Sequence, residues 1–291
     1  MLIQVLANGI IAGAIYALVA SGFSLVYSTA RFVHFAHGAT VAAGAYFLYF
    51  LSMQLGASFW PSAVVAVAFA AAVGIAMNAF VYKPLRCRNA SSLVLLMAGF
   101  AMLVLVEAAL LIAFGADIKT FNAIRVEKGM EIAGAVITPL QVSIIATAAA
   151  LLLGLHLFMK RTRLGKTMRA VACNKTLAEA RGIDVEKTHT YAFAVSSAIA
   201  GVAGVLIGLE QGLEPTMGAN LVIKSFTGTV VGGIGSVPGA VLGSLLVGMA
   251  ENVGAWFLPS GYKDAVAFVL LFAFLLFKPD GLLGINRGVN K

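Results

Sequence analysis

The side chains of this chain that are able to transfer protons or bind ions are few, and they stand within apolar sequence. His34 and His37 are three residues apart, so on a helix both imidazoles would share a face. A metal site needs further ligands, which the sequence does not supply near this pair, so we expect neither a metal nor a cofactor. We expect instead a helix-start or gate residue that faces a polar cavity.

Two acids, Glu107 and Glu251, are the ionisable residues expected inside apolar spans. Acids at that depth are costly and are functional candidates by default. The alternative is that each lies near an interface or is hydrogen-bonded to a neighbouring helix, and the sequence leaves both open. A proton-coupled carrier usually has a chain of such groups. These two acids stand isolated, which disfavours a carrier.

Motifs of known catalytic chemistry are missing from the sequence. There is no G-x-x-x-x-G-K-[ST] phosphate loop, no H-E-x-x-H metal pair and no G-x-S-x-G nucleophile elbow. We therefore expect that the chain is not an enzyme and does not hydrolyse ATP by itself.

The most strongly charged stretch is residues 160–188, with eight basic and three acidic residues in a chain that is only 11% charged. Apolar segments long enough to cross a bilayer lie on both sides of it. Long basic loops between membrane spans belong on the cytoplasmic side. The sequence therefore places 160–188 in the cytoplasm.

Helix signals inside this basic loop predict ordered structure. Three apolar residues recur at i, i+4 and i+7, which predicts one face of a short helix: Leu164, Met168 and Val171. Thr176 followed by Glu179 predicts a capping box, and Gly182 suits the left-handed residue that closes a helix. We expect two short amphipathic helices that form a docking surface for a soluble partner.

Composition sets the fold class. The 291 residues are 60% hydrophobic, with a mean hydropathy of +0.96, which excludes an ordinary soluble globule. We expect an all-α, polytopic helical membrane protein, with one permease-like domain over 1–291. The net charge of +8 is explained by membrane orientation and by anionic lipid headgroups, so no nucleic-acid partner is expected.

The apolar runs predict about eight transmembrane helices plus a short or broken glycine-rich segment. The N-terminus is expected outside, since no base precedes Arg31, and the C-terminus is expected in the cytoplasm. The loop 115–138 is charge-neutral and expected outside. The spans are expected at about 2–27, 38–55, 61–82, 93–114, 140–159, 191–209, 240–257 and 265–277.

The glycine-rich segment is 225–243, and its many glycines together with Pro238 are taken to rule out a uniform helix. Irregular backbone at membrane depth is tolerated only where it is buried in protein or lines a polar cavity. This argument gives our candidates for the lining of a translocation pathway: Phe35, His37, Gly38, Gly232, Gly233, Gly235, Ser236 and Glu251.

Six groups of residues are distributed in order along nearly the whole chain: Phe35-Ala36-His37-Gly38 with Gly44-Ala45-Tyr46, 161–166 with Met168-Arg169-Ala170, Gly182-Ile183 followed by Gly201 and 203–206, 232–236 with Pro238-Gly239-Ala240, Tyr262-Lys263-Asp264, and 279–284. With this ordered set, the chain resembles the LivH-type permease of ATP-binding-cassette (ABC) importers for branched-chain amino acids, and the related urea and amide permeases. One departure is His34, where that family usually has Asn.

This resemblance implies a set of partners and a location. A permease of this kind pairs with a second, LivM-like permease and two cytoplasmic ABC ATPases in a bacterial cytoplasmic (inner) membrane, and an extracytoplasmic binding protein delivers the substrate. The basic loop would be the coupling element, and the residues that the resemblance assigns to it are Leu164, Gly165, Met168, Arg169, Thr176, Glu179, Arg181, Gly182 and Ile183.

The substrate is expected to be small and zwitterionic or neutral, because the spans hold so few charges. Hydrophobic, branched-chain amino acids fit this description, and so do urea and short amides. Two other classes remain as alternatives: a stand-alone secondary carrier, which would work without ATPases, and a membrane-embedded enzyme, which would need a catalytic cluster.

Overall fold

The computed structural model describes residues 2–121, 129–132 and 134–283. Apart from one small hairpin, these residues form helices joined by short connections. The elements in chain order are α1 (Leu2–Ala30), α2 (His37–Tyr49), η1 (Phe50–Gln54), α3 (Phe59–Met77), η2 (Asn78–Tyr82), α4 (Lys83–Cys87), α5 (Ser92–Phe114), β1 (Met130–Ile132), β2 (Ala135–Ile137), α6 (Pro139–Arg161), α7 (Arg163–Cys173), α8 (Lys175–Ala180), α9 (Val185–Gln211), α10 (Met217–Gly232), α11 (Val237–Phe257), η3 (Ser260–Tyr262) and α12 (Lys263–Phe277).

Polar side chains define where the long helices begin. Thr138 and Gln141 form a reciprocal capping box at the start of α6. Asp184 caps α9 by accepting a hydrogen bond from the backbone N–H of Lys187 at 3.0 Å. That hydrogen bond lowers the pKa of the Asp184 carboxyl below its ordinary value, so the cap is ionised at neutral pH.

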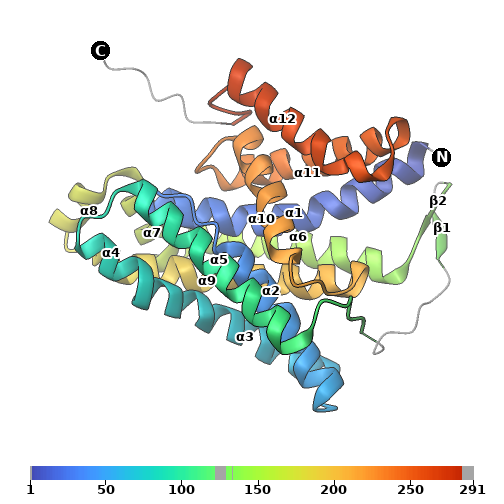
Figure 1. Cartoon of the computed structure of the whole chain (residues 1–291). Helices are drawn as coiled ribbons and strands as arrows, with labels where there is room; N and C mark the ends of the chain where they lie inside the picture. Colours follow the sequence, from blue (N-terminus) through green and yellow to red (C-terminus); the bar gives the residue numbers. More distant parts are fainter. Residues whose placement is uncertain (1, 122–128, 133, 284–291) are drawn as a thin grey trace.

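Helix α1 lies at the centre of the molecule and packs along most of its length against α11, α9 and α10 (Figure 1). Its side chains from Ala14 to Val26 are almost all buried. Helix α9 in turn packs against α2 and α3. Three glycines of α9 are buried there: Gly201, Gly204 and Gly208.

The outer helices α3, α5, α6 and α12 carry exposed, large apolar side chains, among them Val64, Phe80, Ile112, Leu153 and Phe272. Six helices in the described part of the chain are long and apolar enough to cross a membrane: Leu2–Ala30, Phe59–Cys87, Ser92–Phe114, Pro139–Arg161, Val185–Gln211 and Val237–Phe257. The prediction of a polytopic helical membrane protein is confirmed. The remaining apolar helices, α2, α10 and α12, have only 13–16 residues each.

The two ends of the helical body differ in character. Figure 1 shows α4, α7 and α8 gathered at one end, and the N-terminus with the hairpin β1–β2 at the other. At this second end, Lys119 also pairs with Leu213 in an antiparallel bridge between two loops. The basic segment 160–188 and the predicted outer loop 115–138 therefore lie at opposite ends of the molecule.

The all-α fold class fits the described residues, with one small addition: the loop 115–138 contains the antiparallel strands β1 and β2, and residues 122–128 and 133 of that loop lie outside the described residues. The glycine-rich segment is not a uniform helix, as predicted, but its irregular part is short, since α10 continues to Gly232 and α11 begins at Val237.

Only four residues, 233–236, interrupt the helices in this glycine-rich segment. Gly233 and Gly235 have φ of 115° and 90°, a region open to glycine. Pro238 lies in the first turn of α11, where it is compatible with a helix start. The earlier glycines are helical and lie where α10 and α11 approach closely. Gly228 faces Ser244, and Gly232 faces Gly239.

Candidate functional site

The basic loop folds into the two short helices that were predicted, α7 and α8. Met168 and Val171 form the buried face of α7, as expected. The third member of that face is Gly165, which packs against the end of α6, and not Leu164, whose side chain is 39% exposed. Leu164 was therefore assigned to the wrong face, and it points outward together with Leu177 of α8, which is 57% exposed.

The predicted cap of α8 is also wrong. Asn174 is the capping residue, because its side chain accepts a hydrogen bond from the N–H of Leu177 at 3.0 Å. Thr176 lies inside the helix. Glu179 forms no cap and stands 3.9 Å from the ammonium of Lys175, one helical turn away.

The closure of α8 by Gly182 is confirmed. Gly182 has φ of 80°, and its N–H donates to the carbonyl of Glu179, while the N–H of Ile183 donates to that of Ala178. These two bonds form a Schellman motif, which satisfies carbonyls at the helix end. Arg169, Thr176, Glu179 and Arg181 are exposed on the surface around this motif.

Helices α7 and α8 are fixed to the membrane-spanning helices by packing and by a hydrogen bond. Val171, Ala178 and Val185 form one buried apolar cluster that joins α7, α8 and α9, with Ile183 packed against it. On the other side of α7, the guanidinium of Arg31, at the end of α1, donates to the carbonyl of Ala172. A displacement of α7–α8 would therefore act on both α1 and α9.

The start of α9 is linked to α4 as well. Arg86 donates two hydrogen bonds to the carboxylate of Glu186, at 3.2 and 2.8 Å, and a third to Asn78 at 2.7 Å. Asn78 in turn donates to Thr190 at 3.1 Å, so it connects two helices. The end of the molecule that carries the basic loop is thus a connected unit.

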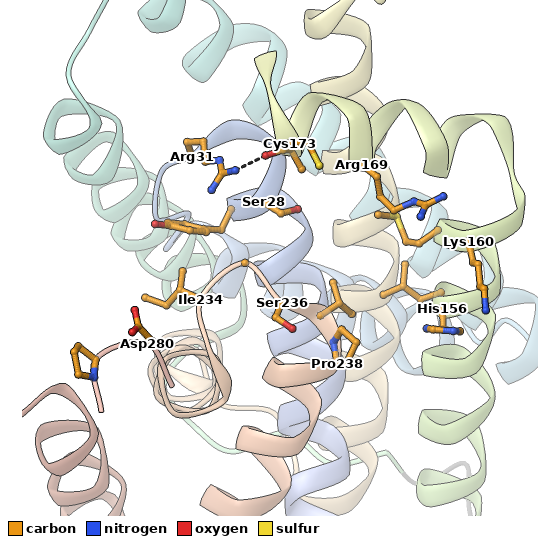
Figure 2. A pocket seen from close by; sticks show the side chains of 17 residues that line it. Ser28, Arg31, His156, Lys160, Arg169, Cys173, Ile234, Ser236, Pro238 and Asp280 are labelled. Atoms are coloured by element: carbon orange, nitrogen blue, oxygen red, sulfur yellow. Dashed lines mark hydrogen bonds between the residues drawn. The ribbon is translucent and has the colours of Figure 1, made fainter. Parts of the chain in front are cut away.

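A cavity of about 950 Å³ lies beside α7 at this end. Figure 2 shows four basic side chains at its wall: His156 and Lys160 of α6, Arg169 of α7, and Arg31, which directly follows α1. The break between α10 and α11 forms another part of the wall, with Gly235 and Ser236 among the lining residues. Both residues are predicted pathway candidates, and they lie at a cavity that also contacts the predicted coupling element.

The other predicted lining segment, Phe35 to Gly38, does not border this cavity. The ring of Phe35 stacks on Phe100 at 4.3 Å and contacts Phe226 at 5.5 Å between centroids. His37 is the first residue of α2, as expected for a helix-start residue, and is fully buried 3.3 Å from the hydroxyl of Ser196. Gly38 lies directly against the backbone of Gly218 on α10.

His34 is not oriented toward a metal partner. Its Nδ1 lies 2.9 Å from the hydroxyl of Tyr82, and its ring packs against Phe193. The segment from His34 to Gly38 is therefore the point where α1, α2, α5, α9 and α10 meet.

Glu251 is not the isolated acid that the sequence suggested. Its side chain is only 1% exposed, and it accepts a hydrogen bond from the hydroxyl of Tyr16 at 2.8 Å. The ammonium of Lys224 is 3.5 Å from Glu251 and 2.8 Å from Asp264. These four side chains, which we call the outer ion cluster, come from α1, α10, α11 and α12.

Lys224 is the residue that sequence analysis missed. The prediction considered only acids inside the spans, and Lys224 lies directly before the glycine-rich segment 225–243, outside the spans that were expected. The available signal was a single base within the apolar run 217–232, since an intramembrane base needs a counter-charge. Glu107, the other acid singled out, is half-buried on α5.

The outer ion cluster borders a second, smaller cavity of about 200 Å³. Its wall carries Tyr16, Lys224 and Asp264 of the cluster, together with Glu214 and Asn220. Buried apolar side chains complete the lining: Ile207, Met217 and Leu221. This cavity lies where α9 ends and α10 and α12 begin.

The sequence profile of the family described as "Branched-chain amino acid transport system / permease component" matches residues 5–275. This match covers more than nine-tenths of the chain. The chain belongs to this family.

Individual members of this family align with the chain over almost their whole length. The permease protein BraD of a high-affinity branched-chain amino acid transport system from Pseudomonas aeruginosa is 36% identical, covering 97% of this chain and 95% of BraD. The corresponding LivH of Escherichia coli K12 is 33% identical with the same coverages. A probable LivH from Methanocaldococcus jannaschii is 30% identical, covering 97% of this chain and 93% of that protein.

Among solved structures, a chain of PsaBC from Streptococcus pneumoniae in complex with Fab is 16% identical and superposes with a TM-score of 0.49, covering 92% of this permease and 88% of that chain. A likeness of this degree supports no conclusion about function.

The two candidate caps of α8 give a direct prediction. Asn174→Ala removes a helix N-cap, which typically costs about 1 kcal/mol, so amide hydrogens of 175–181 should exchange about fivefold faster. Thr176→Ala, two residues further on, is the matched control and should leave exchange unchanged. Hydrogen–deuterium exchange with mass spectrometry measures both. Faster exchange in the Thr176 variant alone would restore the capping box predicted from sequence.

Proposed function

We propose that this permease is the membrane-spanning subunit of an ATP-driven importer of branched-chain amino acids. In this proposal it assembles with a second, LivM-like permease, two cytoplasmic ABC ATPases and an extracytoplasmic binding protein. The relatives that cover almost the whole chain carry branched-chain amino acid transport in their descriptions. This favours branched-chain amino acids over urea or short amides as the substrate.

The observation that carries the proposal is the pair of short helices α7 and α8 at the basic end of the molecule. They expose Leu164, Leu177 and several bases, and the cluster of Val171, Ala178 and Val185 fixes them to α9. A soluble ATPase can bind such a surface through apolar contacts and charge. Because α7 and α8 are anchored in the spans, movement of the ATPases is transmitted to the spans.

The proposed topology has nine helical segments that alternate between the two ends: α1, α2 with η1, α3 with η2 and α4, α5, α6, α9, α10, α11 and α12. The N-terminus is outside and the C-terminus is cytoplasmic. This arrangement puts the bases that follow Tyr82 and those of 160–188 on the cytoplasmic side, in agreement with the positive-inside rule. An odd number of crossings separates the two termini.

The proposed translocation pathway runs from the smaller cavity at the outer ion cluster, the outer cavity, toward the larger cavity beside α7, the inner cavity. Phe35, His37 and Gly38 lie between them in depth, and Gly232, Gly233, Gly235 and Ser236 lie at the cytoplasmic end. Closure of the ATPases on ATP would displace α7–α8 and open one cavity while the other closes. ATP is bound and hydrolysed by the partner subunits, because this chain has no phosphate-binding loop.

The native cysteines provide a test of the topology. Cys87 and Cys173 are the two cysteines of the chain, and both are exposed at the proposed cytoplasmic end. A membrane-impermeant maleimide should label both in inside-out vesicles and neither in intact spheroplasts. The variant in which both are replaced by serine is the control for background. Labelling in spheroplasts would contradict the proposed orientation.

Coupling is tested at Gly182. Gly182→Val places a β-branched residue at φ of 80°, a strained conformation that should distort the end of α8. In proteoliposomes that contain the full transporter, leucine uptake per ATP hydrolysed should fall on the order of tenfold, while insertion in the membrane is unchanged. The assay measures radiolabelled leucine and released phosphate together.

Gly56→Val is the matched control for this experiment. Gly56 has φ of 67°, has open space around its Cα, and lies in the loop before α3 at the opposite end of the molecule. The same backbone strain there should leave the coupling ratio unchanged. Equal loss in both variants, or loss of insertion in the Gly182 variant, would contradict a specific coupling role.

A further inference from the structure

The outer cavity carries charges of both signs beside a patch of apolar side chains. Lys224 supplies an ammonium, and Asp264 and Glu214 supply carboxylates. Ile207, Met217 and Leu221 are more than nine-tenths buried and present apolar surface to the same space. A free amino acid with an aliphatic side chain has this combination of one carboxylate, one ammonium and one apolar group.

The ammonium of Lys224 is positioned by the protein around it. Its Nζ lies 3.5 Å from the buried carboxylate of Glu251, 3.4 Å from the hydroxyl of Tyr16, and 5.6 Å from the centroid of the Tyr16 ring. A buried carboxylate and an aromatic face both favour a cation. These contacts position the ammonium from the protein side and remain available whatever binds in the cavity.

The partner of Lys224 on the cavity side, Asp264, differs from Glu251 in its exposure to solvent. Asp264 approaches at 2.8 Å, but its side chain is 63% exposed, whereas that of Glu251 is 1% exposed. An exposed ion pair is weak because water solvates both groups when it opens. Asp264 can therefore leave Lys224 at little cost, while Glu251 cannot.

Glu251 has one more feature that an ion pair alone does not explain. Its Oε2 accepts from Tyr16 and approaches Lys224, while its Oε1 is buried with no hydrogen-bond partner among the described residues. An unpaired carboxylate oxygen at this depth is costly. Both contacts of Glu251, to Tyr16 and to Lys224, therefore run through Oε2, which fixes the position of the ammonium when Asp264 leaves.

We infer that the outer cavity binds the substrate zwitterion, with Lys224 holding its carboxylate in place of Asp264, Glu214 holding its ammonium, and the Ile207–Met217–Leu221 surface receiving its side chain. This inference rests on the proposed function, which supplies the amino-acid class of the ligand. Asp264 then acts as an exchangeable partner that covers Lys224 between transport events. Glu251 and Tyr16 are positioning residues.

The test is direct binding to the purified full-length chain in detergent. Saturation-transfer NMR titrations with L-leucine measure the affinity. Leucinamide, which lacks the carboxylate, and 4-methylpentanoate, which lacks the ammonium, should both bind at least about tenfold more weakly than leucine. Equal binding of 4-methylpentanoate and leucine would overturn the zwitterion site in favour of a simple anion site.

Two variants separate recognition from structure. Lys224→Met should weaken leucine binding by about tenfold or more, whereas Lys263→Met, the same change at the neighbouring cation outside the cavity lining, should not. Asp264→Asn removes the competitor for Lys224 and should tighten leucine binding several-fold. Asp117→Asn, at an exposed acid of the outer loop, is its control and should have no effect.

Asp264→Asn keeps the inference falsifiable if Lys224→Met does not fold, because Asp264 is largely exposed. Weaker or unchanged leucine binding in the Asp264 variant would overturn the exchange. The proposed function is measured separately, as ATP-driven uptake by the complete transporter. Uptake by the wild type without any effect of Lys224 or Asp264 variants on leucine binding would remove this site and leave the importer standing.

Discussion

Close contact between helix backbones is the constraint on which this structure depends. In a bilayer, apolar side chains gain little by meeting each other instead of lipid, so helices associate through small residues that let them approach. The central helix α1 meets α11 in this way, because Gly9 and Gly13 lie against the backbone of Met249, Leu245 and Gly248. Gly38 and Gly218 do the same for α2 and α10.

The outer ion cluster exists because of this packing. Tyr16, Lys224, Glu251 and Asp264 come from four helices, and their polar atoms meet only because those helices lie close together. Any separation of α1, α10 and α11 would leave Glu251 in apolar surroundings without its partners, which is strongly unfavourable. Helices α1, α10 and α12 also line the outer cavity, and the break between α10 and α11 lines the inner one. Helix packing thus links the two cavities.

The general architecture was predictable from sequence because it follows from local properties. Long apolar runs fix the spans, so α1, α5, α6 and α11 begin and end close to the expected positions. The closure of α8 at Gly182 was also predictable, since only a glycine accommodates that left-handed conformation without strain. Each of these inferences needs residues that are neighbours along the chain.

The remaining features depend on contacts that sequence spacing does not reveal. Asn174 and Thr176 are both good capping residues, and Asn174 caps because its backbone is extended between α7 and α8, whereas Thr176 is already helical. Gly165 displaces Leu164 from the buried face because α7 packs tightly on the end of α6. Lys224 and Glu251 are 27 residues apart and pair only because α10 and α11 run antiparallel. The segment 228–232 stays helical because the small residues of α11 face its glycines.

The central claim is that α7 and α8 join this permease to cytoplasmic ATPases. The most direct measurement is purification of the tagged chain from native membranes in mild detergent, with quantitative mass spectrometry of the proteins that come with it. The claim predicts two ATPase subunits and one second permease per chain. The variant Leu177→Asp, at an exposed position of α8, should lose the ATPases and keep the second permease. Recovery of the chain alone, or only as a self-oligomer, in several mild detergents would contradict the claim.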